Sequence, residues 1–400
     1  MLFNKETNAV KFLIALALGL ALFSTPAVAN FRSCINDLKS HATRLGILST
    51  ITSSALNINE PIAKVLRLSR EQPEFKTPIW DYFSFLIDEQ RIADGIQMMK
   101  RHDDVLSAAE DRFGVNRYVI TAIWGIETNF GRDIGNNFLP HALATLACNG
   151  GRKAGFWRNE LMAALKIVNR GDLKLEHLYS SWAGAFGQTQ FLPSTYLRLA
   201  VDFDEDGRRD LIESTADALG STANFLKRAG WKRKESWMIE VKVPHGYRGT
   251  SGRKQLASLS TWSNRGVVRG DGMPVSGDTK AGLILPAGAN GPGFLVFRNF
   301  NAIYAYNQAE SYALAISHLA DRLAGYPKLR TAWPTDDPGL SRIQRFHLQE
   351  LLVTQGYDIG KVDGKIGPIS RAAIAQAEER AGMRQTGRAG KKIYQILGGE

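Results

Sequence analysis

The spacing of apolar residues constrains the fold of this chain more than any other feature of its sequence. From about Ile62 to Ala229, apolar residues recur at steps of three and four, which is the period of amphipathic helices. Over residues 236–300 the pattern changes to short β-prone runs separated by Gly, Pro, Ser and Asn. A helical pattern returns over residues 307–324. The sequence therefore predicts a mainly α-helical domain that carries a small β-rich insertion.

Residues 1–29 differ in character from the rest of the chain. Two lysines precede an apolar run, and small residues follow up to Ala29, which is the pattern of a cleaved secretory signal peptide. The apolar run is short for a bilayer span, and no later segment is long and apolar enough to cross one. We therefore expect a soluble, periplasmic protein with no membrane span after cleavage.

A stretch rich in Pro and Asp, residues 332–339, predicts a linker between two domains. It separates a domain over residues 30–331, which includes the β-rich insertion, from a C-terminal segment over residues 340–400. That segment has a helical pattern, a turn-rich stretch and a second helical pattern. Its length is sufficient for a compact helical module.

The net charge indicates which partners the protein attracts, and the two cysteines indicate the redox state of its compartment. The net charge of +11 at pH 7 favours attraction to an anionic polymer of the cell envelope. Nucleic acid is not expected as a partner, because the protein is predicted to be exported and its Lys and Arg residues are scattered. Cys34 and Cys148 either form a disulfide, as an oxidising compartment favours, or remain two separate buried thiols.

The segment WGIETNFG, residues 124–131, places a carboxylate in an apolar helical pattern. Glu127 shares a helix face with Ile120, Ile123 and Trp124. Burial raises the pKa of a carboxyl group because a low dielectric penalises its charged form. A Glu that is protonated near neutral pH can act as the general acid that cleaves a glycosidic bond. A Glu on the helix surface, or in a buried ion pair, is the alternative.

The segment SSWAGAFGQTQFLPSTY, residues 180–196, combines small, aromatic and amide side chains. Its Gly and Ala residues allow close approach of the backbone to a ligand. Ser181, Gln188 and Gln190 could direct hydrogen-bonding groups into a cleft beside an acid.

A third segment, residues 302–319, adds a cluster of polar aromatic side chains. The pattern predicts a helix that starts at Tyr306 and Asn307. Tyr312 would then lie about a turn and a half further along the same helix.

Together these segments resemble the membrane-bound lytic transglycosylase B family of peptidoglycan-cleaving enzymes. The resemblance covers residues 31 to about 324 and implies a lysozyme-like helical catalytic domain in which Glu127 is the single catalytic acid and base. It also implies that a set of side chains contacts the substrate. In the basic pair among them, Lys153 stands where the family usually has Arg. These side chains are Ser181, Gln190, Tyr306, Asn307, Tyr312, Arg152 and Lys153. The matching motifs are IWGIETNFGR, WAGAFGQTQFLPSTYLRLAVDFDEDG, DALGSTANFLKRAGW and YNQAESYALAI.

The resemblance implies a lytic reaction on peptidoglycan glycan strands, with no cofactor for the chemistry. Glu127 would protonate the bond between N-acetylmuramic acid and N-acetylglucosamine and then accept a proton from the C6 hydroxyl, leaving a 1,6-anhydromuramic acid end. Ordinary glycosidases use two carboxylates, whereas the matched segment offers one. The alternatives are a hydrolytic muramidase and an inactive cell-wall-binding scaffold protein. The oligomeric state is not predicted.

The segment DFDEDGRRDLIE, residues 202–213, has the spacing of an EF-hand loop, and the family resemblance also implies a calcium-binding loop here. The expected function of the ion is structural. The alternative is a solvated acidic turn, in which arginine side chains balance the charge. Arg209 departs from the pattern, because such loops usually have an aliphatic residue there. The candidate ligands are Asp202, Asp204, Asp206, Arg208 through its carbonyl, Asp210 and Glu213.

The C-terminal segment resembles the type 1 peptidoglycan-binding domain. The match lies in LQELLVTQGYDIGKVDGKIGPISRAAIAQA, residues 348–377. The resemblance implies a three-helix module that docks onto the cell wall. A structural appendage with no affinity for the wall is the alternative.

Overall fold

The computed structural model describes residues 26–71, 77–149 and 151–400. The predicted signal peptide therefore lies almost wholly outside the described residues, and α1 begins just before its expected cleavage site. Within the described ranges, no helix combines the length and the apolar character needed to cross a membrane.

Helices dominate the described residues, which confirms the predicted mainly α-helical fold. Within the predicted helical region, Asp88 separates two helices, and its carboxylate caps the second one by accepting a bond from the Arg91 N–H at 2.8 Å. The helices that precede the β-rich insertion are α1 (Pro26–Arg44), α2 (Ser49–Ala55), α3 (Ala63–Glu71), α4 (Ile79–Leu86), α5 (Glu89–Arg101), α6 (Asp103–Phe113), α7 (Arg117–Thr128), α8 (Leu139–Asn149), α9 (Ala154–Asn169), α10 (Pro193–Leu199) and α11 (Thr215–Arg228).

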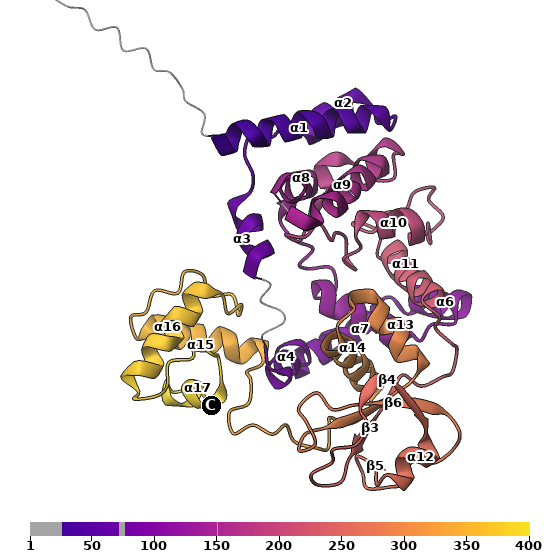
Figure 1. Cartoon of the computed structure of the whole chain (residues 1–400), viewed down its shortest axis with the longest axis vertical. Coiled ribbons are helices and arrows are strands. Elements are labelled where there is room, and N and C mark those ends of the chain that lie inside the picture. Colours follow the sequence, from indigo (N-terminus) through magenta and orange to yellow (C-terminus); the bar gives the residue numbers. More distant parts are fainter. Residues whose placement is uncertain (1–25, 72–76, 150) are drawn as a thin grey trace, which may run out of the picture.

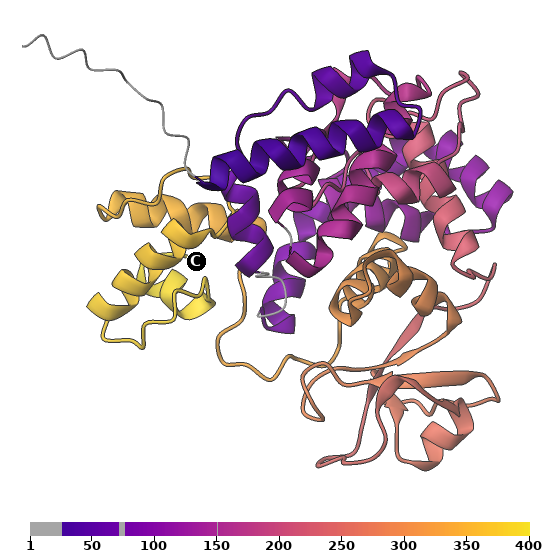
Figure 2. The ribbon, with the colours of Figure 1, turned by 45° about the horizontal axis from the view of Figure 1, so that its top comes forward.

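These helices pack around two apolar clusters. One cluster includes Leu38 of α1, Leu143 of α8 and Leu165 of α9, all buried. The other includes Ile120 of α7 and Leu226 of α11. Figures 1 and 2 show α1 lying across α8 and α9, with α7 between these helices and the sheet. The two clusters place α7 in the interior of the domain.

A disulfide joins Cys34 on α1 to Cys148 at the end of α8. The two Cα atoms are 5.9 Å apart, and the residues are separated by 114 positions in the sequence. The bond attaches the N-terminal helix to a helix that belongs to the same apolar cluster.

The β-rich insertion is a five-stranded antiparallel sheet, which confirms this part of the predicted fold class. Its strand order is β4-β6-β7-β3-β5, and the short helix α12 (Leu259–Asn264) places the fully buried Trp262 in its core. The strands are β3 (Met238–Lys242), β4 (Gly252–Ser258), β5 (Val268–Arg269), β6 (Lys280–Ile284) and β7 (Gly293–Val296).

The two ends of the insertion lie close together, where the chain leaves the helical domain and returns to it. The buried side chain of Asn299 accepts a hydrogen bond from the Lys232 N–H at 2.7 Å. Its amide group donates to the carbonyls of Lys232 and Glu235 at 2.8 and 2.7 Å. One side chain therefore fastens the start of the insertion to the residues that follow its end.

Two helices follow the insertion, α13 (Arg298–Asn307) and α14 (Glu310–Leu323). The predicted helix start at Tyr306 and Asn307 is therefore wrong, because these residues end α13. The physical reason is Gln308, which has a left-handed backbone with φ 45° and closes α13 by donating its N–H to the Tyr304 carbonyl. The chain then turns before α14 begins.

The C-terminal segment folds into three helices around its own apolar cluster, as predicted. They are α15 (Arg342–Thr354), α16 (Pro368–Arg380) and α17 (Lys391–Ile396). A capping box between Ser341 and Gln344 begins α15. We refer to these three helices as the C-terminal module.

Two arginines hold the C-terminal module against the helical domain. Arg388 donates to both carboxylate oxygens of Asp81 on α4, at 2.6 and 2.7 Å. Arg342 makes a similar pair with Asp88 at 2.9 and 3.1 Å, and it donates to the Asn129 side chain at 2.7 Å. Both aspartates are buried. The module therefore contacts the segment that directly follows α7.

Candidate active site

Glu127 lies in the last turn of α7, and the chain after it is tightly turned. Asn129, Phe130 and Gly131 all have left-handed backbones, with φ of 51°, 62° and 81°. This turn folds the Phe130 ring back over Gly125, where a Cβ atom would lie 2.7 Å from the ring. Only glycine fits at that position of the helix without a shift of the ring. The tight turn therefore fixes the end of the helix that carries the carboxylate.

The half-buried carboxylate of Glu127 accepts a hydrogen bond from the Tyr312 hydroxyl at 2.5 Å. Tyr312 lies in the first turn of α14, is 2% exposed, and belongs to the cluster that contains α7. Burial and the nearby Glu127 charge raise the pKa of Tyr312 well above its ordinary value. Tyr312 is therefore a permanent hydrogen-bond donor to Glu127 at neutral pH.

Tyr306 extends this aromatic group toward the loop of residues 180–191. Its ring is parallel to that of Tyr312 to within 10°, with centroids 6.4 Å apart. Its hydroxyl donates to the Thr189 carbonyl at 2.7 Å, and burial, with a smaller effect of the Glu127 charge, raises its pKa. The structure thus brings together Glu127, Tyr306 and Tyr312 from two regions of the sequence.

The loop of residues 180–191 is joined to the end of α7 by hydrogen bonds. The Thr128 hydroxyl donates to the Gln188 carbonyl at 2.5 Å. The Gln190 amide donates to the carbonyls of Ile134 and Gly187, both at 3.1 Å. The Ser181 hydroxyl, in contrast, accepts a bond from the Ala185 N–H within its own turn, at 3.2 Å. Ser181 and Gln190 are both half-buried, with part of each accessible.

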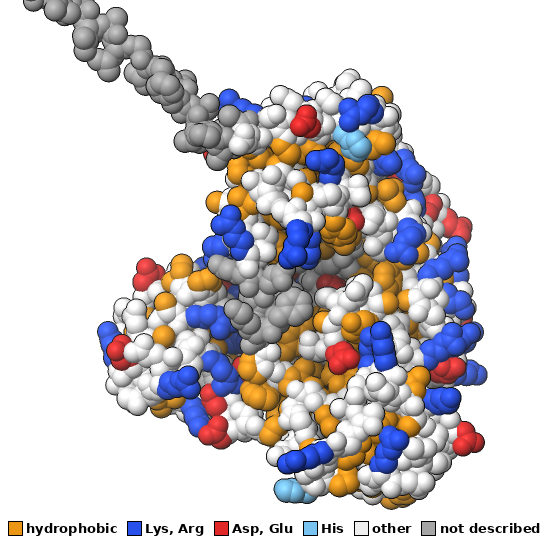
Figure 3. All heavy atoms as spheres, viewed as in Figure 1, with side chains coloured by type: hydrophobic (Ala, Val, Ile, Leu, Met, Phe, Trp, Pro, Cys, Tyr) orange, Lys and Arg blue, Asp and Glu red, His pale blue; other side chains and the backbone are white. Residues whose placement is uncertain are grey.

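Three of the predicted substrate contacts lie at the surface. Asn307 is exposed at the end of α13. Arg152 and Lys153 are exposed in a short 3-10 helix, η2 (Gly151–Lys153), that leads into α9. Within the part of the chain that the structure describes, no hydrogen bond or ion pair joins Arg152 or Lys153 to Glu127, Tyr306 or Tyr312. Figure 3 shows the face of the molecule hollowed between α8 and α9 above and α13 and α14 below, with Lys and Arg side chains around it.

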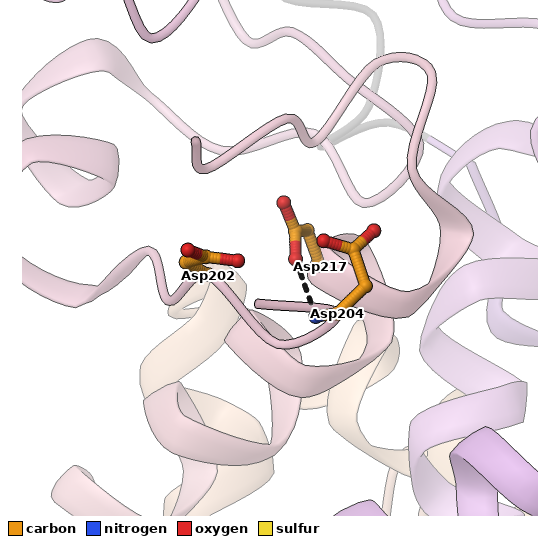
Figure 4. Close-up of side chains that lie close together, drawn as sticks. All are labelled: Asp202, Asp204 and Asp217. Carbon is orange, nitrogen blue, oxygen red and sulfur yellow. Dashed lines mark hydrogen bonds between the residues drawn. The ribbon is translucent and has the colours of Figure 1, made fainter. Parts of the chain in front are cut away.

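An acidic group lies beside α11, in the segment predicted to bind calcium. Carboxylate oxygens of Asp202, Asp204 and Asp217 all lie within 4.8 Å of one another (Figure 4). One oxygen of Asp202 is buried, and no residue in the described ranges forms a hydrogen bond with it. A buried carboxylate oxygen that lacks a donor is costly unless a cation is present. These three residues therefore suit a divalent cation that prefers oxygen ligands.

The other predicted ligands take different positions. Asp206 forms an exposed ion pair with the Arg208 side chain at 3.1 Å. Asp210 accepts bonds from the N–H groups of Ile212 and Glu213, both at 2.9 Å. The carboxylate of Glu213 is exposed, 3.9 Å from the His177 ring. The structure thus brings Asp202 and Asp204 together with Asp217, but leaves Asp206, Asp210 and Glu213 outside that group.

Sequence reasoning missed Asp217, which lies beyond the twelve-residue loop. Its carboxylate accepts bonds from the N–H groups of Phe203 and Asp210, both at 2.6 Å, and so organises the loop from α11. Burial raises the pKa of Asp217 to about 6. The unusual Arg209 is explained as well, because it forms an ion pair with Asp172 outside the loop. The only available signal for Asp217 was an acidic residue in the first turn of a helix.

Two family models match the chain. Residues 30–321 match the transglycosylase SLT domain, and residues 343–397 match the peptidoglycan binding domain. The first match covers well over half of the chain and contains every side chain of the Glu127 site. The second coincides with the C-terminal module.

Among curated proteins, the chain is similar to membrane-bound lytic murein transglycosylase B of Escherichia coli (strain K12), with 30% identity over 249 residues. That match covers 61% of this chain and 66% of the relative, just under two thirds of its length. Among solved structures, SltB3 of Pseudomonas aeruginosa in complex with NAG-anhNAM-pentapeptide is 38% identical, with a TM-score of 0.73 over 92% of this chain and 99% of that one. The Escherichia coli lytic transglycosylase Slt35 in complex with calcium is 28% identical, with a TM-score of 0.64 over 74% and 92% of the two chains.

Proposed function

Because the chain belongs to the lytic transglycosylase family, which acts on peptidoglycan, we propose that it cleaves the β-1,4 bond between N-acetylmuramic acid and N-acetylglucosamine. The hydrogen bond between Tyr312 and the Glu127 carboxylate is the observation that supports Glu127 as the catalytic residue. It holds a single carboxyl group in one orientation at the end of a rigid helix. Such fixed placement is what proton transfer to a bound substrate requires.

In the proposed reaction Glu127 acts first as an acid and then as a base. Its proton passes to the glycosidic oxygen as the bond from that oxygen to C1 breaks. The muramoyl N-acetyl group stabilises the cationic sugar. The C6 hydroxyl then attacks C1, and its proton passes to the Glu127 carboxylate. The product ends in 1,6-anhydromuramic acid, no water is consumed, and Glu127 regains its starting protonation state.

The neighbours of Glu127 have separate functions in this proposal. Tyr312 holds one carboxylate oxygen, while Ser181 and Gln190 offer accessible polar groups to the sugar. Asn307, Arg152 and Lys153, which are exposed, would contact more distant parts of the glycan strand. Asp133, the carboxylate nearest in sequence, is bound to Lys365 of the C-terminal module at 2.6 Å. That ion pair supports a mechanism with one catalytic carboxylate.

The masses of the products test the lytic mechanism. Purified peptidoglycan is digested with the protein, and the released fragments are analysed by mass spectrometry. We expect anhydro ends, lighter by one water than the products of hydrolysis. A digest that contains only reducing muramic ends would instead establish a hydrolytic muramidase.

Replacing Tyr312 with Phe is expected to lower kcat by about 10- to 100-fold, because a hydrogen bond to a charged group contributes about 1.5–3 kcal/mol. KM should change little, and the pH profile of kcat should shift, since the donor acts on Glu127 rather than on the substrate. Tyr306→Phe is the matched control. The Tyr306 hydroxyl bonds to the Thr189 backbone, so the Tyr306→Phe variant should keep the pH profile of the parent protein. Equal shifts of the two profiles would contradict the assignment.

We further propose that Asp202, Asp204 and Asp217 hold a structural calcium ion. The unpartnered Asp202 oxygen supports this, as does the calcium in the Slt35 structure. The ion would neutralise the carboxylates and fasten the loop to α11. It takes no part in the chemistry.

Calcium is expected to raise the thermal stability of the protein. At a concentration one hundred times Kd, the gain is about 2.7 kcal/mol. Asp204→Asn should weaken calcium binding at least tenfold in a calorimetric titration, because an amide replaces a charged ligand. Glu205→Gln removes the same charge from an exposed neighbour outside the group and should leave the affinity unchanged. If neither calcium nor Asp204→Asn alters the melting temperature, the proposal fails.

The location and the wall affinity are proposals as well. We propose that residues 1–29 direct export to the periplasm and are removed, and that the C-terminal module binds the cell wall. Export is tested by fractionating cells and sequencing the mature N-terminus, which should begin at Asn30. Sedimentation of the protein with insoluble peptidoglycan, with and without the module, tests wall binding.

A further inference from the structure

A cavity away from Glu127 lies between the helical domain and the sheet. It encloses about 700 Å³ and is lined by the α6–α7 turn, the segment from Trp231 into β3, the turn after β5, the last turns of α14, and residues 326–330. A volume of this size accommodates a small-molecule ligand. Nothing in the proposed chemistry uses it.

Two tryptophans and a buried acid make this cavity chemically specific. The rings of Trp231 and Trp237 lie 6.1 Å apart, inclined by 32°. Trp237 donates its indole N–H to the Asp321 carboxylate at 3.0 Å, whereas the buried indole N–H of Trp231 has no hydrogen-bond partner among the described residues. Burial raises the pKa of Asp321 to about 7. Flat apolar rings beside a carboxyl group and an unused donor suit a sugar, which has both apolar faces and polar edges.

The rim of the cavity carries basic side chains beside the carboxylates of Glu110, Glu235, Glu240 and Asp271. Of its basic side chains, Arg233 and Arg269 are paired with Asp111 and Asp271. The remaining three have no carboxylate within ion-pair distance among the described residues, and all are exposed. They are Lys234, Lys328 and Arg330. Because carboxylates and basic side chains are equally numerous in the lining, the three unpaired cations favour a ligand with localised negative groups, such as carboxylates, rather than a polyanion.

We propose that this cavity is a second, non-catalytic binding site for the same polymer, taking an N-acetylated amino sugar that carries an acidic peptide. The sugar ring lies against the tryptophans and accepts the Trp231 N–H, while the peptide carboxylates meet the three rim cations. This inference rests on the proposed substrate class, and it adds a site that the cleavage reaction does not need.

The placement of the cavity allows simultaneous occupation with the catalytic site. Tyr312 begins α14 beside Glu127, whereas Asp321 lies near the other end of the same helix. Nine residues of helix separate them by about 13 Å, since a helix rises about 1.5 Å per residue. A fragment held in the cavity would therefore be anchored close to the site of cleavage without entering it.

Calorimetric titration of the full chain tests the proposal. The titrant is a soluble N-acetylglucosaminyl-anhydromuramoyl-peptide, and the protein carries Glu127→Gln so that binding is measured without turnover. We expect at least two binding sites, the catalytic site and the cavity, in addition to any site on the C-terminal module. Adding Lys328→Glu and Arg330→Glu should remove one of them or weaken it at least tenfold. Both residues are exposed, so the fold should be retained.

Lys254→Glu and Lys280→Glu form the matched control, because they reverse two exposed charges on the same sheet outside the cavity. They should leave both sites intact. A single site in the Glu127→Gln protein, or equal losses in the rim and control variants, would overturn the proposal. Cleavage assays on the otherwise wild-type chain separate the two ideas: a lack of anhydro products refutes the proposed function, whereas a missing second site with normal cleavage refutes only this inference.

Discussion

Glu127→Gln is expected to lower kcat on peptidoglycan by about 10²–10⁴-fold, the usual contribution of a general acid or base. Glutamine keeps the size of the side chain and can still accept the Tyr312 hydroxyl, so the geometry of the site should survive. It cannot, however, donate a proton to the glycosidic oxygen or accept one from the C6 hydroxyl. The measurement is the rate of release of anhydro fragments, together with sedimentation on insoluble wall, which should be unchanged.

Asp133→Asn is the matched control for this loss of a carboxylate. Asp133 follows α7 closely, but its side chain is exposed and paired with an exposed lysine. Such surface pairs contribute about 0–1 kcal/mol. The control should therefore cleave at nearly the parental rate. If Glu127→Gln cleaved as well as the parent, or if Asp133→Asn lost equally much activity, Glu127 would not be the catalytic acid.

The second large effect is expected when Arg342 and Arg388 are both replaced by Ala. Each replacement leaves a buried aspartate without its charged partner, which typically costs about 3–5 kcal/mol. Although burial opposes ionisation of Asp88, hydrogen bonds from Arg342 and the Arg91 backbone lower its pKa. We therefore expect the C-terminal module to detach from α4 and α5. Small-angle X-ray scattering should show a larger radius of gyration.

A variant that removes two charges from exposed pairs provides the comparison. Lys365 and Lys392 pair with Asp133 and Asp336, and the side chains of both lysines are about half exposed or more. Replacing both with Ala should leave the scattering profile unchanged. The Asp88 pair also has a pH signature. Folding lowers the pKa of Asp88, so the pair contributes fully to stability above the pKa that Asp88 has in the unfolded chain. This contribution is lost as the pH falls through the lowered pKa of Asp88 in the folded protein. Docking of the module should therefore weaken in acid.

Patterns that are local in the sequence predicted the fold well. Apolar spacing predicted the helical region that contains α7, α9 and α11, because burial of one helix face leaves a direct periodic trace. It did not find the turn between α13 and α14. That turn depends on a left-handed Gln308, and glutamine carries no signal for such a conformation.

The candidate site was predictable only in part, for a similar reason. The acid is visible as one carboxylate in an apolar helix, but Tyr312 lies 185 residues away from it. Its placement on Glu127 depends on how α14 packs against α7. Asp217 and the Arg342–Asp88 pair are also products of tertiary contact. Residue spacing along one segment contains no information about such encounters.

Asn299 fastens the two ends of the insertion together. This contact has a consequence for the evolution of the fold. An insert whose entry and exit are adjacent imposes little closure entropy on its host, whatever its length. The helical core could therefore have acquired, enlarged or exchanged this unit without disturbing the geometry around its carboxylate. Diversification among related enzymes would then be concentrated here, where new surfaces can arise at small cost to folding.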